Sequence, residues 1–427
     1  MHKPQYRKPA ALFMMLAALL LLNPEHVASQ INMNMPYSIY GVGEIRSNQY
    51  FQNLGMGGIN QGYRTNVSIN DVNPASYAAL DSTSFVFEAT MFSHFYEQET
   101  ADVTQQSDNI SLGNLSFGFP VTSWWRFAAG IQPYSQIGYR IRDVEHHEQA
   151  GQVNYLYEGS GGINQFFFGS SLELFDGLSV GANVSYLFGN LDYQAEVRSD
   201  SSGVFQTNLT NRNRVKGWMY GFGAQYHHKF SDHRHITLGA TYGHQQEANV
   251  NSSDILMRRL QGDNFFDTIA ELDREEGLMT LPAYYGFGFY GQLNRRWSGG
   301  MDYQWQNWDS FEFPGKTEDF NDSYRVAAGV RYSPEAETFS TVFQRLEYTA
   351  GVRYEQAYLK PQGESLNEFG ISFGTRIPIR GSLSALNLNF EYSQRGSVND
   401  HQMRENFYRI NVSVNIYERW FIRRRFL

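Results

Sequence analysis

The stretch Tyr408–Leu427, YRINVSVNIYERWFIRRRFL, decides the fold. From Tyr408 to Ile416 every second residue is apolar, and the residues between them are Arg, Asn or Ser. Such alternation is typical of a strand with one apolar and one polar face. A strand near the chain end has to pair with another strand, because otherwise it leaves an open edge. The same alternation recurs many times upstream, which predicts a sheet closed on itself.

Alternation upstream predicts an all-β chain: a transmembrane antiparallel β-barrel of about 14 strands, an even number as in single-chain bacterial barrels. The predicted strands are Ser82–Phe95, Asp108–Phe119, Trp125–Ile141, Asn154–Leu174, Leu178–Val197, Val215–Phe230, Ile236–Ala248, Leu281–Leu293, Trp297–Trp308, Ser323–Tyr332, Leu346–Tyr354, Phe369–Ile377, Leu386–Ser393 and Tyr408–Ile416.

Two features favour a membrane barrel over a soluble sandwich. The strands are long, and their polar faces are rich in Gly, Ser, Asn and Arg, which suits a lumen. Connections also alternate between short turns and long loops, with Ser333–Arg345 as a longer turn on the short side. Short periplasmic turns and longer outer loops are the known asymmetry of such barrels.

The composition agrees with this class of protein. Aromatic residues make up 16% of the 427 residues and charged residues 18%, with 39 Gly and no Cys. A mean hydropathy of −0.47 excludes a helical membrane protein, whereas a barrel hides its lipid face in alternate residues. The net charge of −9 argues against nucleic acid as a partner.

The N-terminus predicts export. Lys3, Arg7 and Lys8 precede the apolar run Ala10–Leu22, and small residues follow up to Ser29. This pattern predicts a signal peptide over residues 1–29. Residues 30–81 are rich in Gly, Asn and Ser but also hold Met, Ile, Tyr and Phe, which favours a compact N-terminal hatch over a linker. The barrel is then expected over residues 82–427.

The longest predicted loop is Asn249–Thr280. Its apolar residues follow a rough helical period, which predicts a helical outer loop that covers the barrel mouth or captures a hydrophobic ligand. Packing on neighbouring loops is the alternative. The candidate capture residues are Ile255, Leu256, Leu260, Phe265, Phe266 and Ile269.

Two predicted strands contain internal interruptions, at Gly113-Asn114 and at Gly161-Gly162. Glycine within a strand marks a bulge or a kink. Such a break either opens a side port in the wall or only bends the strand. Inward charged residues, among them Arg325, Arg353, Arg409 and Glu391, either line a pathway or, as we expect for most of them, form a salt-bridge lattice that fixes the barrel and the hatch.

No motif for catalysis or for metal binding stands out. The chain has no P-loop or HExxH motif, and within each of the pairs His146-His147 and His227-His228 the two side chains are expected to point to opposite faces of a strand. We therefore expect neither enzyme activity nor a cofactor nor a metal.

Several segments resemble the FadL/TodX family of outer-membrane transporters for long-chain fatty acids and other hydrophobic compounds. In the hatch these are Gly55-Met56-Gly57-Gly58 and Asn73-Pro74-Ala75. Further similarity lies in Gly161–Gln165, Gly181–Gly189, Leu281-Pro282 and Gly286–Phe289, and the ending Trp420–Arg424 looks like Bacteroidetes members.

This resemblance implies a Gram-negative outer-membrane barrel whose N-terminal hatch plugs the lumen. It also implies passive uptake of hydrophobic molecules, with capture at the outer loops and lateral exit through the wall at a kinked strand. The expected partners are fatty acids or similar compounds, together with outer-membrane lipid and lipopolysaccharide, and the expected state is a monomer. The alternative is a shuttle or scaffold in protein secretion or surface assembly, as in some Bacteroidetes members of the superfamily.

Overall fold

The computed structural model describes residues 35–46, 50–100, 103–148, 151–199, 201, 205–260, 265–273, 276–315, 320–334, 341–398 and 403–419. The predicted signal peptide and the ending Trp420–Arg424 lie outside these residues. The strands are β1 Glu44–Ile45, β2 Ser84–Glu99, β3 Thr104–Pro120, β4 Trp125–His147, β5 Gly151–Phe175, β6 Leu178–Ser199, β7 Phe205–Ser231, β8 Arg234–Gly243, β9 Gln246–Leu260, β10 Asp267–Asp273, β11 Gly277–Leu281, β12 Tyr284–Gln292, β13 Trp297–Gln306, β14 Ser323–Tyr332, β15 Glu347–Gln356, β16 Asn367–Pro378, β17 Ala385–Arg395 and β18 Arg404–Arg419. Short 3-10 helices are η2 Pro36–Ile39, η3 Phe51–Met56, η4 Pro74–Ala79, η5 Trp308–Ser310, η6 Val342–Arg345 and η7 Pro361–Gly363.

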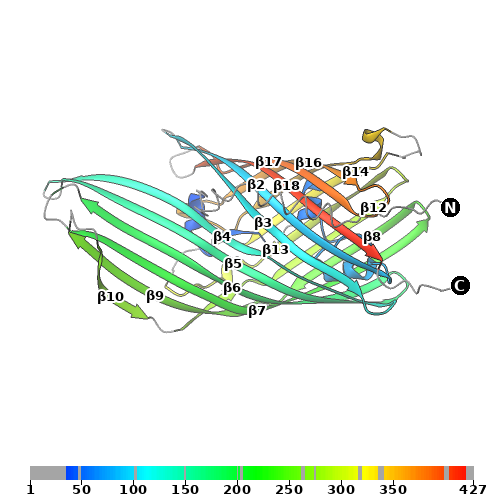
Figure 1. The fold of residues 1–427 in the computed structure, drawn as a ribbon, viewed down its shortest axis with the longest axis horizontal. Coiled ribbons are helices and arrows are strands. Elements are labelled where there is room, and N and C mark those ends of the chain that lie inside the picture. The colour runs from blue at the N-terminus through cyan, green and yellow to red at the C-terminus, as the bar shows by residue number, and fades with distance from the viewer. Residues whose placement is uncertain are drawn as a thin grey trace, which may run out of the picture. The chain divides into compact units, whose positions relative to one another are not determined.

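Fourteen antiparallel strands, β2–β8 and β12–β18, form a closed barrel (Figure 1). Neighbours in sequence pair throughout, β8 pairs with β12, and β18 pairs with β2 from Arg404↔Glu99 to Arg419↔Ser84. The long last strand thus removes the open edge that the C-terminal sequence would otherwise leave. The predicted all-β class and strand number are confirmed. Short turns and both ends of the barrel sequence lie at one end, here called the turn end; the opposite end is the loop end.

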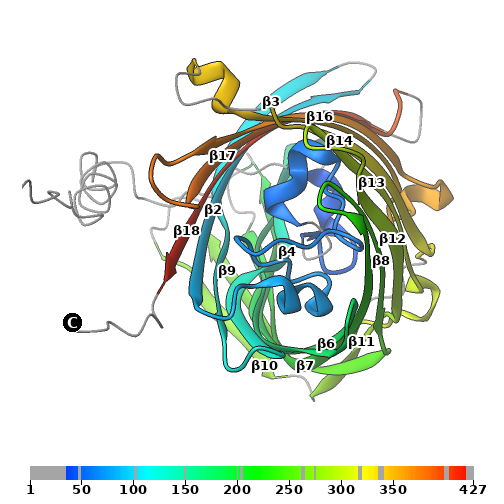
Figure 2. The same cartoon turned by 90° about the vertical axis from the view of Figure 1, so that its right-hand side faces the viewer.

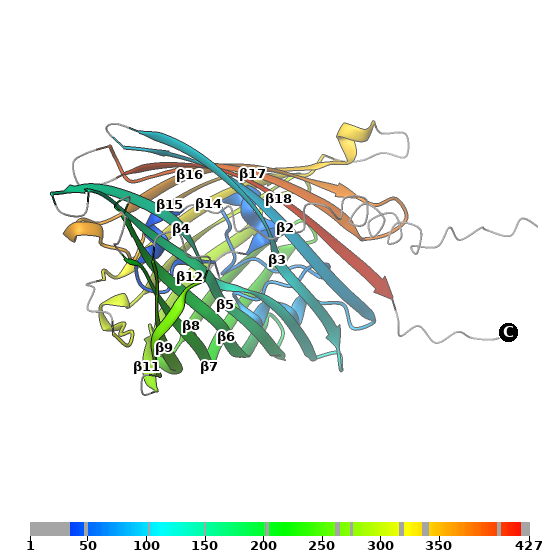
Figure 3. The same ribbon diagram turned by 60° about the vertical axis from the view of Figure 1, so that its left-hand side comes forward.

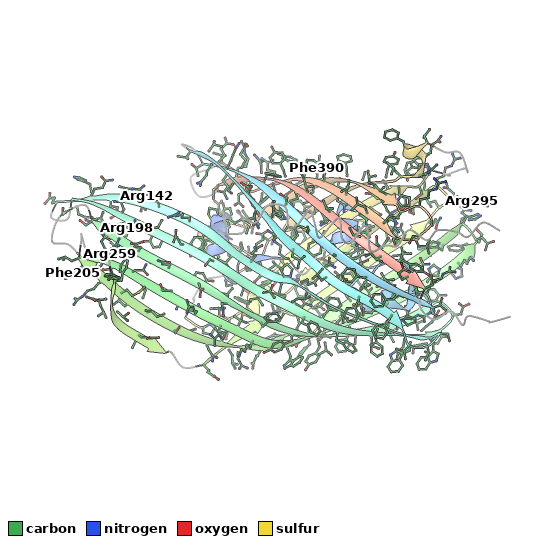
Figure 4. All side chains as sticks on the ribbon, viewed as in Figure 1. Arg142, Arg198, Phe205, Arg259, Arg295 and Phe390 are labelled. Atoms are coloured by element: carbon green, nitrogen blue, oxygen red, sulfur yellow. The ribbon has the colours of Figure 1, made fainter. Side chains whose placement is uncertain are left out.

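Outward-facing residues of the barrel are apolar. In β16, Phe369, Ile371 and Phe373 are exposed, whereas the alternating residues Glu368 and Ser372 are buried on the inner side. The same pattern places Phe287 and Phe289 of β12 and Phe390 of β17 on the outside (Figure 4). Water-soluble monomers rarely expose so continuous an apolar surface. Among the described residues, no helix is long and apolar enough to cross a membrane.

Four neighbouring strands extend far beyond the rest at the loop end. β4 has 23 residues, β5 has 25, β6 has 22 and β7 has 27, whereas a membrane-spanning strand needs about 9–11. β9 lies along β7 from Phe205↔Leu260 to Gly217↔Ala248, and β10 and β11 lie along β9. The predicted helical loop Asn249–Thr280 is therefore wrong. Of the apolar residues that suggested a helix, Ile255, Leu256 and Leu260 are held in β9 by pairing with β7, and Ile269 and Leu272 are held in β10 by pairing with β9. Local periodicity does not reveal such pairing.

The described residues between 35 and 80, here called the N-terminal segment, lie within the ring of strands (Figure 2). The segment is held by hydrogen bonds to inward-facing side chains, including Tyr77 Oη to Asn183 Oδ1 at 3.0 Å and Gly57 N to Ser372 Oγ at 3.0 Å. Glycines of the wall allow this close approach. A Cβ on Gly351 would lie 2.2 Å from Gly57 N, and one on Gly181 would lie 2.5 Å from the Pro74 carbonyl carbon. Backbone therefore lies directly on backbone.

Candidate functional site

The barrel wall contains a break between β3 and β4. The two strands pair only from Leu115↔Ile131 to Pro120↔Arg126, near the turn end. Beyond that point β3 stays paired with β2 as far as Thr104↔Glu99, whereas β4 stays paired with β5 as far as His147↔Gly151. Figure 3 shows β2 and β3 running together away from β4 and β5. From Ile131 toward the loop end, β4 therefore has no pairing with β3.

Both strands carry a bulge where they part. In β3 the register shifts at Gly113, which has no partner between Thr90↔Asn114 and Met91↔Leu112. In β4 it shifts at Tyr134, between Pro133↔Asn164 and Ser135↔Ile163. A bulge bends its strand and increases the local twist, so the two bulges account for the divergence of the strands.

The N-terminal segment takes the place that β3 leaves empty. β1 pairs antiparallel with β4 through Glu44↔Gln136 and Ile45↔Ser135. Hydrogen bonds continue this pairing on both sides: Arg46 N donates to Tyr134 O at 2.8 Å, and Met35 N donates to Gly138 O at 2.6 Å. Gly138 N donates in turn to Ser38 Oγ at 3.1 Å. The polar backbone of the β4 edge is thus satisfied by a segment that belongs to no wall strand.

Gly43 makes this approach possible. Its φ of +87° is strained for other residues, and a Cβ there would lie 2.4 Å from Gln136 O and 2.6 Å from Ile137 Cγ1. From the opposite side, Tyr358 Oη donates to Gly43 O at 2.6 Å. The segment is therefore clamped between β4 and the loop that follows β15.

An apolar cluster fills the lumen beside the break. Ile137 and Tyr139 of β4 belong to it, as do Tyr37 and Val42 of the N-terminal segment. Inward-facing residues of the long strands add to it, because their inner faces become apolar toward the loop end. Residues of β9, β11 and the connections after β13 and β15 complete it. Its buried members are Tyr37, Val42, Tyr134, Ile137, Tyr139, Ile163, Leu187, Leu191, Val215, Ala248, Val250, Met279, Leu281, Trp308, Phe311, Phe313, Tyr358, Leu359 and Leu366. The expectation of a polar inner face thus fails for this half of the barrel.

A cavity of about 60 Å³ lies next to the cluster. Tyr134 lines it, and so do Gln132 and Asp71, whose side chains are joined by a hydrogen bond from Gln132 Nε2 to Asp71 Oδ2 at 2.6 Å. Burial raises the pKa of Asp71 to about 6, against the lowering effect of the Gln132 amide. Pockets for small organic ligands measure about 300–1,000 Å³, so this cavity holds only a few waters.

On the other side of the break, an ion-pair cluster anchors the segment to the wall. Arg353 of β15 donates to Glu368 and Glu391, and Arg409 Nη1 donates to Glu391 at 2.6 Å. Arg395 of β17 reaches Glu44 of β1 at 2.7 Å and Glu405 of β18 at 2.7 Å. These side chains are almost completely buried, and each charge has an opposite partner, as burial requires. The expected salt-bridge lattice is confirmed for Arg353, Arg409 and Glu391, whereas Arg325 donates to the Gly57 carbonyl at 2.6 Å.

The predicted hatch residues all lie within the N-terminal segment. Gly57 and Gly58 have positive φ angles of 68° and 73°, and Gly55 lies against Gly374 of β16. Asn73 caps η4: its Oδ1 accepts from Ala75 N at 3.2 Å, and Pro74 occupies the first turn. These residues support the segment but do not touch the break.

The predicted kink residues fall on both sides of β4. Gly113 and Asn114 lie at the bulge of β3, on the break itself. Gly161 has a φ of +103° and pairs with Ile137, and Gly162 pairs with Gln136, so both lie in β5 on the closed side of β4. A role for either pair as a port stays a prediction.

The predicted capture residues do not gather around the break. Ile255, Leu256 and Leu260 lie in β9 and Ile269 lies in β10, all in the extension at the loop end. Phe265 is exposed and Phe266 contacts the guanidinium of Arg259 (Figure 4 labels Arg259). Their role in capture also stays a prediction.

Sequence reasoning missed β1, Gly43 and the bulge at Tyr134. One signal was present: Pro133 lies inside the predicted strand Trp125–Ile141, and proline within a sheet is confined to edges and bulges. Among the described residues, no group of three or more His, Asp or Glu side chains could hold a metal ion.

Comparisons with known proteins agree with this architecture. A family model described as BamG matches residues 12–427. The toluene transporter TodX of Pseudomonas putida superposes with a TM-score of 0.61 at 18% identity, covering 89% of this chain and 100% of TodX. The CymD monoaromatic hydrocarbon channel gives 0.58 at 14% identity, covering 90% and 100%, and a Pseudomonas aeruginosa FadL homologue gives 0.56 at 14%, covering 87% and 99%. No curated protein matches the sequence. At these identities the superpositions show a shared fold.

Proposed function

The chain belongs to the BamG family, and we propose that it is an outer-membrane channel for hydrophobic molecules, which leave sideways through the wall between β3 and β4. The apolar outer surface supports the membrane location. In that setting the turn end faces the periplasm and the loop end faces outward, as the lengths of the connections indicate.

One observation carries the proposal: the apolar cluster reaches the break in the wall, and among the described residues the N-terminal segment alone pairs with the free edge of β4 there. Ile137 belongs both to the β4 edge and to the cluster. A molecule among these side chains is therefore one layer of protein away from the membrane. The layer consists of Met35–Arg46, held by main-chain hydrogen bonds and by Glu44.

The route we propose starts at the loop end, with capture by residues of β9 and β10. A hydrophobic molecule then enters the apolar cluster, displaces part of the segment, and passes into the membrane through the break. No step needs an energy source, so the movement is passive. Long-chain fatty acids or smaller apolar compounds are the proposed ligands, in line with the relatives described as hydrocarbon and toluene transporters.

The N-terminal segment would also seal the barrel toward the periplasm, as a hatch. Its contacts with the wall support this role, because wall glycines let its backbone approach to within van der Waals distance. A lumen sealed at the turn end would require a molecule to leave sideways through the wall. Water-soluble molecules would find no continuous path, and this distinguishes the proposal from a general porin.

A disulfide between β1 and β4 tests the route. Ile45 and Ser135 lie opposite each other, at the Cα separation that antiparallel pairs share and that a disulfide can bridge. The chain has no cysteine, so Ile45→Cys with Ser135→Cys forms one defined bond. We expect oxidised protein in lipid vesicles to lose passage of a fluorescent fatty acid, and reductant to restore it.

The control is Ala224→Cys with Ala240→Cys, which joins β7 and β8 where they are permanently paired. Its oxidation should leave passage unchanged. Equal passage in the oxidised and reduced Ile45/Ser135 variant would refute lateral exit at this break.

The extension formed by β4–β7 and β9 favours a second candidate function, that of a scaffold in protein secretion or surface assembly. It projects beyond what a membrane requires, and Arg142, Arg198 and Arg259 lie on it (Figure 4). Shortening the β6–β7 and β9–β10 hairpins should then remove co-purifying partner proteins and leave fatty-acid passage intact. Loss of passage with unchanged partners would favour the channel.

A further inference from the structure

The loops that follow β13 and β15 meet at the loop end through four aromatic rings. Trp308 of η5 stacks on Tyr358 with ring centroids 4.0 Å apart, and it also contacts Phe311 at 5.1 Å. Phe320 closes the set, because it contacts Phe311 at 5.1 Å and Tyr358 at 5.6 Å. A hydrogen bond from Asn321 N to Tyr358 O at 3.0 Å also joins the two loops. The four aromatic side chains are here called the mouth cluster.

The mouth cluster is the part of the luminal apolar cluster that these loops contribute. Trp308, Phe311 and Tyr358 are buried members of the apolar cluster, and Phe320 packs against it. Trp308 is only 1% exposed, although it belongs to a loop at the end of the barrel. A molecule that enters the apolar cluster past these loops therefore has to displace one or more of the four rings.

Tyr358 also contacts the N-terminal segment where that segment fills the break. Its Oη donates to Gly43 O at 2.6 Å, directly before Glu44 and Ile45, which pair with β4. Its ring reaches Gly41, where a Cβ would lie 2.9 Å from Tyr358 Cε2. One buried side chain thus touches a loop of the mouth with its ring face and the segment in the break with its hydroxyl.

We propose that Tyr358 is a positioning residue that couples entry at the loop end to opening of the break. When a molecule displaces Trp308, Tyr358 loses its stacking partner and withdraws its hydroxyl from Gly43, which loosens β1 on the β4 edge. When the apolar cluster holds no molecule, the stack returns Tyr358 to Gly43 and the break stays filled. This inference rests on the proposed passage of hydrophobic molecules through the break.

The coupling depends on a difference in binding between two states. A ligand shifts a conformational equilibrium only if it binds one state better than the other. Here the entering molecule and the Trp308 ring compete for the same apolar surroundings, so binding favours the state in which Trp308 has left Tyr358. Coupling between two sites in proteins typically amounts to a factor of about 5–150. Loss of one hydrogen bond, such as that from Tyr358 to Gly43, corresponds to about twofold to tenfold.

Hydrogen exchange of the full chain in lipid nanodiscs tests the coupling through a double-mutant cycle. Arg46 and Gly138 report on the break, because both amides donate hydrogen bonds across it. Tyr358→Phe removes the hydroxyl but keeps the stacked ring, and it should raise exchange at both amides about twofold to tenfold. Trp308→Ala should raise exchange by a similar factor. The double variant should exchange no faster than Tyr358→Phe alone, because both changes break the same link.

Addition of oleic acid gives a second readout, which a purely structural role of Tyr358 would not change. Oleic acid should raise exchange at Arg46 and Gly138 in the wild-type protein. It should leave the already raised exchange of Tyr358→Phe unchanged, because the link through which it acts is absent there.

Two matched controls remove the same groups elsewhere. Tyr348 also donates to a backbone carbonyl, Phe343 O at 2.9 Å, but at the turn end, so Tyr348→Phe should leave exchange at the break unchanged. Trp218 contacts Tyr186 on the outer surface at 5.0 Å, so Trp218→Ala should also leave it unchanged. Folding of each variant is checked by the heat-dependent shift of its migration in detergent gels. If Trp308→Ala does not fold, Trp308→Leu takes its place, because it keeps an apolar side chain without the ring.

Effects of Trp308→Ala and Tyr358→Phe that multiply in the double variant would overturn the inference, since the two side chains would then act independently. Unchanged exchange in Tyr358→Phe would overturn it as well, and so would an equal rise in either control. Oleic acid that crosses vesicle membranes through the wild-type protein without raising exchange would also refute the coupling. If oleic acid does not cross at all, the proposed function fails, which is a separate result from the mutant cycle.

Discussion

Arg395 of β17 donates a hydrogen bond from Nη1 to Glu44 Oε2 at 2.7 Å, which ties the two-residue strand β1 to the wall on the other side of the break. The contact joins residues 351 positions apart in the chain. β1 therefore has two attachments: the β4 edge on one side and the ion-pair cluster on the other. Both hold the segment in the break, so each can be weakened separately.

Glu44→Gln should loosen the segment without unfolding the barrel. Breaking a buried ion pair costs about 3–5 kcal/mol, and here Arg395 keeps Glu405 at 2.7 Å, so the lower end of that range applies. We expect faster trypsin cleavage after Arg46 and faster passage of a fluorescent fatty acid. Glu355→Gln, in the same cluster but not in contact with β1, should cause neither change. Equal cleavage rates in wild type and Glu44→Gln would contradict a tethering role.

Gly43→Val should separate β1 from β4. Its side chain would enter the space of Gln136 O, and the φ of +87° adds strain of about 1–2 kcal/mol. Gly363→Val is a matched control, because Gly363 has the same φ of +87° with no atom within 4 Å of its Cβ. Hydrogen exchange at Gly138 and Arg46 should rise in Gly43→Val alone. Similar exchange in both variants would mean that backbone strain, and not the clash, decides the outcome.

Deleting Gly113 should extend the pairing of β3 with β4. Gly113 is the extra residue of the bulge, so its removal restores the register on both sides, from Thr90↔Asn114 to Met91↔Leu112. With less bend, β3 is expected to follow β4 further and narrow the break. Passage of the fatty acid through vesicle membranes should slow. Unchanged passage, with the deletion variant folded, would show that the bulge does not set the width of the break.

Asp71→Asn should change how stability depends on pH. Asp71 belongs to the N-terminal segment, and its pKa in the folded protein is about 6, against 3.8 when unfolded. A raised pKa means that folding favours the protonated acid, so stability falls as pH rises from about 4 to 6 and is constant above. The loss is at most about 3 kcal/mol. The Asn variant keeps an acceptor for Gln132 without this loss.

The unfolding temperature of both proteins between pH 4 and pH 8 measures the difference. Asp71→Asn should gain stability relative to wild type up to about pH 6 and then remain ahead by a constant margin. Asp232→Asn, in an exposed turn, serves as the comparison. A constant difference across the whole range would show that burial does not perturb Asp71.

Much of the barrel could be predicted from sequence, because each wall strand exposes one face to an apolar and one to a polar environment. Ser323–Tyr332 was predicted to the residue, and the other strands were found with shifted ends. The rule failed in β9. Ile255 and Leu256 are both half-buried, so no alternation separates them, and the pairing with β7 is what makes this segment a strand.

The break in the wall could not be predicted, because pairing between strands is not visible in either strand alone. Trp125–Ile141 has good alternation on both sides of Ile131, where its partner departs. Only Pro133 and Gly113 marked the place. The partner that replaces β3 is the dipeptide Glu44-Ile45, too short for any periodicity to reveal.

The backbone-on-backbone contacts between wall glycines and the N-terminal segment also constrain how the molecule is made. Gly351 and Gly374 leave room for η3, and Gly181 and Gly223 for η4, with clearances that would not admit one further carbon atom. If the folded N-terminal segment entered a barrel that had already closed, its side chains would have to pass these close contacts. We therefore expect the N-terminal segment to be in place before β18 joins β2 and closes the barrel.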